Sequence, residues 1–176
     1  MASTTKKATF ASDNNTNDNA MRTALFAGSF DPFTTGHASV VRRILPLFDR
    51  LVIGIGYNKA KEHTSPAAKR VEAISRLYAA DKRIEVTAYS CLTVDMARQI
   101  GAQYIVKGIR NYADFERERE QADINRHIAG VETIFIAAEP GLESVSSSMV
   151  RELAMFGHDV TEFLPSTETS NEHTTL

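Results

Sequence analysis

The chain is poor in features that would place it outside the reducing interior of a cell. Its 176 residues include a single cysteine, Cys91, which excludes an internal disulfide and a multi-cysteine metal site. No apolar run approaches the roughly 20 residues that a membrane span needs, and the first residues lack the apolar segment of a signal peptide. We therefore expect a cytoplasmic protein without a membrane partner.

The chain also has no excess of basic over acidic residues, and it lacks two common glycine-rich motifs of nucleotide-binding proteins. The formal net charge is −2, so the composition gives no reason to expect a nucleic-acid partner. A Walker A loop is absent, and so is a GxGxxG pattern, which argues against a dinucleotide-dependent oxidoreductase. The chain does have 43% hydrophobic and 24% charged residues, which is typical of a globular domain with a core.

The chain divides into three regions by composition. Residues 1–20 are rich in Ser, Thr, Asn and Asp and contain little to bury, which predicts a disordered N-terminal extension. Residues 166–176 have a similar composition and predict a disordered tail. Residues 21–165 are expected to form one folded domain, because short apolar runs alternate there with amphipathic ones.

This alternation predicts an α/β fold. Short apolar and β-branched runs are typical of buried parallel strands, and the runs between them have helical spacing. Strands joined by helices give right-handed crossovers and a Rossmann-like, doubly wound sheet of five parallel strands in the order 3-2-1-4-5. In this order the ligand crevice opens at the carboxyl ends of strands 1 and 4. The expected strands cover residues 23–27, 51–56, 84–88, 104–107 and 133–138.

Proline and serine mark two helix boundaries. Pro46 comes late in the helix expected after Gly36, so it should kink or shorten the last turn of that helix. Ser65 and Pro66 predict the start of the next helix, with the serine as N-cap and the proline at the first helical position.

The segment Gly28–His37 follows the first expected strand and leads into a helix. Backbone N–H groups at a helix N-terminus attract anions, and residues such as Gly28 and Gly36 let a phosphate approach the chain closely. The imidazole of His37 can donate a hydrogen bond to a phosphate oxygen. A turn with a chance histidine is the simpler alternative, but the short spacing of these residues favours phosphate binding.

Polar side chains follow the other strands at the same edge of the sheet. Lys107 and Arg110 come after the fourth strand, and Arg110 can bind phosphate oxygens with two donors. Ser146–Ser148 follow the fifth strand, where one hydroxyl is expected to cap a helix and the surplus ones to help hold an anion. Lys61 follows the second strand. Each could be ordinary solvated surface, but four such loops suit a nucleoside triphosphate and a second phosphorylated substrate.

A likeness to a known family rests on four segments, which are Gly28–His37, Lys107–Arg110 with Asp114–Glu116, Asp123–Arg126 and Ser146–Arg151. Over roughly residues 22–165 the chain resembles the nucleotidylyltransferases with a T/HxGH motif, and within them the bacterial phosphopantetheine adenylyltransferases. This resemblance implies a nucleotidylyltransferase domain over residues 21–165. It also implies an enzyme of coenzyme A biosynthesis that converts ATP and 4′-phosphopantetheine to dephospho-coenzyme A and pyrophosphate. Mg²⁺ would arrive with ATP without protein metal ligands, coenzyme A would be a further ligand, and the protein would be a homohexamer.

The resemblance also implies roles for individual residues. His37 would hydrogen-bond the α-phosphate in the transition state, Arg110 would bind the β- and γ-phosphates, and Lys61 would complete the catalytic set. The substrate-binding residues would be Ser29, Lys61, Thr93 and Lys107. The ATP-binding residues would be Ser29, Phe30, Gly36, His37, Gly108, Ile109, Arg110, Glu118, Leu142, Glu143, Ser144, Val145, Ser146, Ser147 and Ser148.

Three positions depart from the usual pattern of this family. Ser29 stands where threonine is usual, and it keeps the hydroxyl. Lys107 stands where arginine is common; the charge remains, but the two-donor grip is lost, which we expect to weaken binding of the substrate phosphate. Arg117 stands where an aromatic residue is common.

Two other functions stay open at this point. The same chemistry could act on another phosphorylated acceptor, such as nicotinamide mononucleotide, or on glycerol 3-phosphate with CTP. The preference for phosphopantetheine rests on the resemblance. The chain could also be a nucleotide-binding module without turnover, although the histidine and the cations argue against that function.

Overall fold

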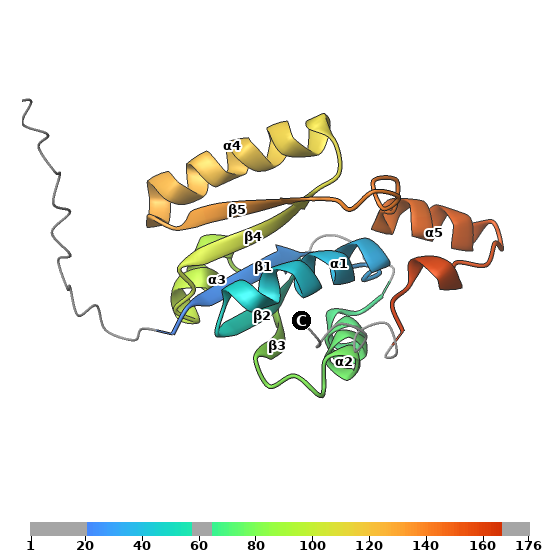
Figure 1. The fold of residues 1–176 in the computed structure, drawn as a ribbon, viewed down its shortest axis with the longest axis horizontal. Helices are drawn as coiled ribbons and strands as arrows, with labels where there is room; N and C mark the ends of the chain where they lie inside the picture. Colours follow the sequence, from blue (N-terminus) through green and yellow to red (C-terminus); the bar gives the residue numbers. More distant parts are fainter. Residues whose placement is uncertain (1–20, 58–64, 167–176) are drawn as a thin grey trace, which may run out of the picture.

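A computed structural model describes residues 21–57 and 65–166, which fold around one parallel sheet (Figure 1). Neighbouring strands pair in the order β3-β2-β1-β4-β5, and each pair is parallel. The predicted Rossmann-like, doubly wound sheet is therefore confirmed. The strands are β1 (Thr23–Gly28), β2 (Arg50–Gly56), β3 (Ile84–Tyr89), β4 (Tyr104–Ile109) and β5 (Glu132–Ala137).

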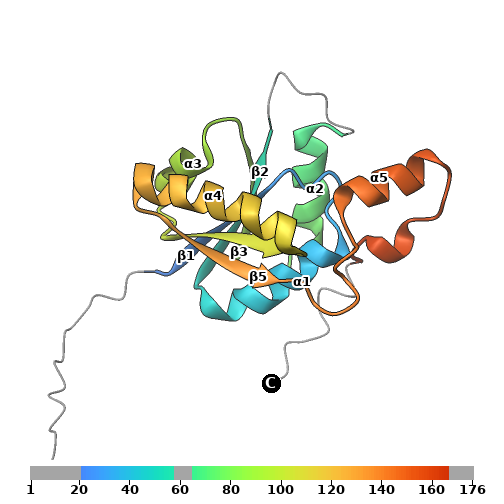
Figure 2. The ribbon, with the colours of Figure 1, turned by 90° about the horizontal axis from the view of Figure 1, so that it is seen from above.

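Helices cover both faces of the sheet (Figures 1 and 2). The first two helices pack on one face, and the third and fourth pack on the other. The last helix lies beyond the sheet, where the Ser147 hydroxyl donates to the Pro32 carbonyl oxygen at 2.8 Å. The helices are α1 (Thr35–Ile44), α2 (Ala67–Leu77), α3 (Thr93–Gln99), α4 (Tyr112–Ala129) and α5 (Ser147–Met155), with short 3₁₀ turns at Leu45–Leu47 and Thr161–Phe163.

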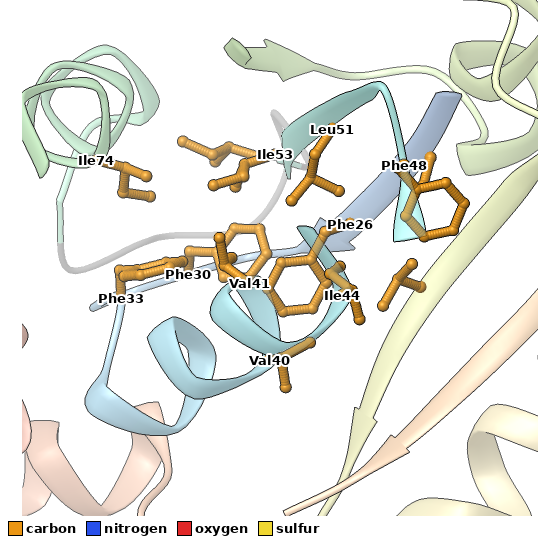
Figure 3. Close-up of a cluster of buried hydrophobic side chains, with 13 residues drawn as sticks. Phe26, Phe30, Phe33, Val40, Val41, Ile44, Phe48, Leu51, Ile53 and Ile74 are labelled. Atoms are coloured by element: carbon orange, nitrogen blue, oxygen red, sulfur yellow. The ribbon is translucent and has the colours of Figure 1, made fainter. Parts of the chain in front are cut away.

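The apolar core beneath α1 and α2 fixes the loop that follows β1 (Figure 3). Phe26, Phe30 and Phe33 pack there with Ile44 of α1, and all four are buried. A Cβ atom added at Gly28 would come within 2.8 Å of ring carbons of Phe30. Gly28 is therefore needed to admit this ring, and burial of a phenylalanine side chain contributes about 2–3 kcal/mol of stability.

Proline shapes the ends of two helices. Pro46 lies in the 3₁₀ turn that follows α1, which confirms that it shortens that helix. At α2 the prediction is wrong in detail, because Pro66 is the N-cap and no side chain caps the helix. Ser65 instead uses its backbone, since its carbonyl oxygen accepts from the Arg70 Nε at 3.1 Å.

Parts of the expected organisation fall outside the described residues. These are the extension over residues 1–20, the tail beyond residue 166, and the segment 58–64 that contains Lys61. Within residues 21–57 and 65–166, no helix is both long enough and apolar enough to cross a membrane.

Candidate active site

A cavity of about 380 Å³ opens at the carboxyl ends of β1 and β4, where the strand order reverses. This is the place at which such sheets bind ligands and at which the sequence predicts the crevice. The loops after β1, β4 and β5 supply its walls. The predicted site residues that line it are Ser29, Phe30, Gly36, His37, Lys107, Gly108, Ile109, Arg110, Glu118, Leu142, Val145, Ser146, Ser147 and Ser148.

Three predicted site residues in the described ranges lie away from the walls of this cavity. Glu143 and Ser144 are exposed, and the carboxylate of Glu143 accepts from the Gly141 N–H at 2.7 Å, which ties it to its own turn. Thr93 begins α3 and lines a neighbouring cavity of about 290 Å³. Lys61, the other predicted catalytic cation, lies outside the described residues.

His37 lies in the first turn of α1, and Thr34 fixes its tautomer. The Thr34 N–H donates to Nδ1 of His37 at 2.9 Å, and the Thr34 hydroxyl lies 2.9 Å from the same nitrogen. A ring nitrogen that accepts from a backbone N–H carries no proton, so the neutral ring carries its proton on Nε2. His37 can therefore donate one hydrogen bond from Nε2.

Aromatic side chains surround His37 and keep it neutral. The ring of Phe30 meets it edge-on at 5.0 Å between ring centroids, and the Phe33 ring lies at 5.3 Å. Burial, and secondarily the positive charge of Arg110, lower the pKa of His37 to about 4. At neutral pH the residue is thus an uncharged hydrogen-bond donor in the wall of the cavity.

Arg110 is held by one carboxylate at the start of α4. Its Nε and Nη2 donate to the two oxygens of Asp114 at 2.8 and 3.2 Å, and Nη2 of Arg117 donates to the same carboxylate at 2.6 Å. Burial alone would raise the pKa of Asp114, but the hydrogen bond and charge of Arg110, with the charge of Arg117, outweigh burial and lower it. Two guanidinium groups share one carboxylate, so this cluster keeps a net positive charge.

Lys107 and Glu118 form an ion pair at the border of the two cavities. The Lys107 Nζ lies 3.2 Å from a carboxylate oxygen of Glu118, and both residues line both cavities. The sequence predicts separate roles for them, whereas the structure brings them together. Lysine has three N–H donors, so the pair leaves Lys107 with donors for a phosphate.

The three serines at the start of α5 already have partners. The Ser146 hydroxyl accepts from a backbone N–H of the first turn at 3.1 Å, which confirms the predicted cap. Ser147 donates to the Pro32 carbonyl oxygen, and the Ser148 hydroxyl accepts from Arg151 at 3.2 Å. Ser146 and Ser148 only accept in these bonds and keep their O–H protons, whereas Ser147 donates its proton to Pro32. That the serines help hold an anion stays a prediction, and the N–H groups of the first turn of α5 would add to it.

Sequence reasoning missed the residues that orient the site. Thr34 stands three residues before His37, which is the spacing of a capping box, and Asp114 stands four residues after Arg110, which is the spacing of a helical ion pair. Both signals could have been found. Arg70, which binds the Ser29 carbonyl oxygen from 41 residues away, has no such signal, because its partner lies in another loop.

The fold and the position of the cavity are those of an α/β protein of the cytidylyltransferase-like class. The family model with that description matches residues 25–153. Two solved structures of a bifunctional NMN adenylyltransferase/ADP ribose pyrophosphatase from Francisella tularensis share the fold, with TM-scores of 0.63 and 0.65. They are 13% and 14% identical over 83% and 84% of this chain, which spans under half of theirs (45% and 46%). At this identity the likeness shows the fold alone.

Curated relatives are far more similar. A phosphopantetheine adenylyltransferase of Phocaeicola vulgatus is 57% identical over 145 residues, which are 82% of this chain and 96% of that protein. Those of Bacteroides fragilis and Porphyromonas gingivalis are each 53% identical, over 82% and 81% of this chain and 97% and 93% of theirs. The chain therefore belongs to the phosphopantetheine adenylyltransferase family.

Proposed function

We propose that this protein transfers the adenylyl group of ATP to 4′-phosphopantetheine, giving dephospho-coenzyme A and pyrophosphate. The observation that carries the proposal is a neutral histidine, His37, with its proton on Nε2, in the wall of a cavity that also contains Arg110. Relatives at 52–57% identity bear the name of this enzyme. The protein would thus be a nucleotidyltransferase of coenzyme A biosynthesis.

The proposed chemistry needs no general base. A phosphate oxygen of 4′-phosphopantetheine, already ionised at neutral pH, forms a bond to the α-phosphorus of ATP, and the bond from that phosphorus to the β-phosphate breaks. The electron pair leaves with pyrophosphate. Negative charge grows on the α-phosphate oxygens, where the Nε2–H of His37 can stabilise it. Arg110 would bind the β- and γ-phosphates and so stabilise the leaving group.

The loops around the cavity would hold the rest of the nucleotide. We assign the backbone of Ser29 and Phe30 to the phosphates, and Gly108 with Ile109 to the nucleotide wall. The loop 142–148, which ends at the N-terminus of α5, would bind the triphosphate and the adenine side. Within that loop, the assignment of Glu143 and Ser144 rests on the family resemblance.

The second cavity would take the pantetheine arm, and Lys107 at its border would hold the acceptor phosphate together with Lys61. The wall of this cavity combines apolar side chains such as Ile124 with the amide of Asn125, which suits an arm that contains amide groups. Thr93 lies in the same wall. Dephospho-coenzyme A and coenzyme A share this arm, so both are proposed ligands of the same site.

Magnesium is proposed to enter with ATP and to neutralise part of the triphosphate charge. Among residues 21–57 and 65–166, no group of three His, Cys, Asp or Glu side chains could hold a metal ion. The carboxylates that line the ATP cavity, Asp114, Glu118 and Glu139, each pair with a cation. Phosphate oxygens would therefore provide most of the ligands of the ion.

A screen of acceptors tests the proposal. The full-length protein, ATP and Mg²⁺ are combined with 4′-phosphopantetheine or nicotinamide mononucleotide, and in a parallel set CTP is combined with glycerol 3-phosphate. Pyrophosphate release is measured, and the product is identified by mass spectrometry. We expect turnover with 4′-phosphopantetheine. Selective turnover of another acceptor would overturn the substrate, and ATP binding without any product would indicate a non-catalytic module.

We further propose that the protein is a cytoplasmic homohexamer. Large apolar side chains are exposed on α4 and at the end of α5, among them Tyr112 (72%), Met155 (74%) and Phe156 (69%). Exposed apolar surface of this kind is typical of subunit contacts, and the family resemblance supplies the number six. Size-exclusion chromatography with light scattering tests it; a stable monomer at micromolar concentration would refute it.

A further inference from the structure

Arg70, near the start of α2, is buried behind the loop that carries Ser29 and Phe30. The residue is only 5% exposed. Its Nη1 donates to the carbonyl oxygen of Ser29, and its Nε donates to that of Ser65 at 3.1 Å. One guanidinium thus joins the loop after β1 to the segment before α2. Arg70 lines a separate cavity of about 670 Å³, and Phe30 separates this cavity from the nucleotide cavity by lining both.

The bond to Arg70 sets the direction of the Ser29–Phe30 peptide. This peptide is trans, so its C=O and N–H groups point in opposite directions. Because the C=O points toward Arg70, the N–H of Phe30 points away from α2. Ser29 and Phe30 line the nucleotide cavity, whereas Arg70 does not, and from this we infer that the N–H faces that cavity. Phe30 has a φ of +48°, which non-glycine residues adopt rarely, so this orientation needs contacts to hold it.

We propose that Arg70 is a positioning residue that holds this peptide with the Phe30 N–H facing the phosphates of the bound nucleotide. The inference rests on the proposed function, because it concerns the same nucleotide site. A second arginine acts on the other side of Phe30, since Nη1 of Arg151 donates to the Asp31 carbonyl oxygen. Carbonyl oxygens repel phosphate, so both guanidinium groups keep these oxygens turned from the nucleotide and leave N–H groups to meet it.

An arginine at position 70 carries a cost in stability beside its two hydrogen bonds. Among the residues that the structure describes, its buried Nη2 has no hydrogen-bond partner, and a buried, incompletely paired charge is costly. Replacement by methionine removes this charge, but it also leaves the carbonyl oxygens of Ser29 and Ser65 without their donor, which costs stability. R70M should therefore fold with a somewhat lower Tm, while its loop loses the bond that orients the peptide.

The experiment compares the steady-state kinetics of the full-length wild type and R70M. We expect kcat to fall about 10- to 100-fold, the cost of a misplaced or lost transition-state donor, with a Tm within about 5 °C of the wild type. The KM for 4′-phosphopantetheine should change less than kcat, because Ser29 is the only one of the proposed acceptor contacts that lies in this loop. R70K keeps the charge but not the two-donor fork, so it should recover only part of the lost kcat.

Two variants serve as controls. R76M makes the same replacement at an exposed arginine of the same helix, paired with Glu72. V52A truncates a buried side chain in the core on the other face of the sheet and so lowers stability away from this loop. Both should keep the wild-type kcat when assayed well below their Tm.

A measurement without turnover separates this inference from the proposed function. The amide signal of Phe30 is followed by NMR while ATP is added, and we expect a large shift in the wild type and a smaller one in R70M. If the wild type makes no dephospho-coenzyme A, the proposed reaction is wrong, but the proposed role of Arg70 in nucleotide binding is not contradicted. An ATP-induced shift of equal size in both proteins, or a kcat of R70M within twofold of the wild type, would overturn the role of Arg70. If R70M does not fold, R70K is judged by the same criteria.

Discussion

The side chains proposed to bind the nucleotide and those proposed to bind the acceptor are oriented in different ways. On the nucleotide side, Thr34 orients His37 and Asp114 orients Arg110, each from three or four residues away. On the acceptor side, Lys107 depends on an ion pair with Glu118 at 3.2 Å. Preorganisation is thus greatest where charge would develop at the α-phosphorus, which is where electrostatic catalysis gains most from it.

The two sides also differ in charge. Arg110 and Arg117 share the carboxylate of Asp114, which leaves a positive charge for the triphosphate. The Lys107–Glu118 pair is neutral as a unit, so the acceptor phosphate that we propose for this lysine would have to compete with Glu118. We therefore expect substitutions on the nucleotide side to cost turnover and those on the acceptor side to change binding.

Loss of His37 is the strongest test of this difference. H37A removes the Nε2–H donor, so kcat should fall about 100- to 1,000-fold, while the KM for ATP changes little. Steady-state kinetics with both substrates measure this split. H158Q, a change at an exposed histidine, is the matched control and should behave as the wild type. A kcat of H37A equal to that of the wild type would remove the proposed role.

Loss of the carboxylate that orients Arg110 should have the next largest effect. D114N weakens the charged bonds to two guanidinium groups, so kcat/KM for ATP should fall about tenfold, as expected for a buried charged hydrogen bond. The control is D123N, because Asp123 pairs with Arg119 and Arg126 on the exposed face of the same helix. Exposed pairs contribute little, so equal losses in both variants would contradict the proposed role of Asp114.

A change on the acceptor side should have a smaller effect and should improve binding. K107R restores a two-donor cation, so the KM for 4′-phosphopantetheine should fall about threefold, with the KM for ATP unchanged. K82R makes the same change at an exposed lysine and should change neither constant. A rise in the KM for the acceptor would show that the compact ammonium fits this phosphate better.

Acidification should leave catalysis by His37 almost unchanged over a wide range. The pKa of about 4 lies below the ordinary value of 6.5, so the ring stays neutral well below pH 6. Burial of neutral His37 also makes the free energy of unfolding depend on pH. This free energy is unaffected above pH 6.5 and falls as the pH falls from 6.5 toward 4, because the histidine of the unfolded chain takes up a proton before that of the folded chain. NMR titration of the ring gives the pKa, and urea unfolding at pH 7, 5 and 4 gives the stability. A pKa of the His37 ring near 6.5 would contradict its role as a neutral donor. As a control, H37Q should lose less stability on acidification than the wild type does.

Features with partners nearby in the chain were predictable from the sequence. The five strands, the cap at Ser146 and the shortening at Pro46 are confirmed, because each depends on local spacing or on backbone restriction. The prediction that Ser65 caps α2 was wrong, because Pro66 is the N-cap and Ser65 instead accepts from Arg70 through its carbonyl oxygen. The bond from the Ser147 hydroxyl to a carbonyl of the loop after β1 was not predictable, because its partner lies far away in the chain.

The sequence by itself determined the parallel sheet, its strand order and the edge at which the site lies, because apolar alternation and the handedness of crossovers are contained in local patterns. Only the tertiary structure decided that His37 is neutral, that Lys107 is paired with Glu118, and that the Ser29–Phe30 peptide is turned toward Arg70. These features depend on how separate helices, strands and loops pack against one another and on the dry surroundings that they form together.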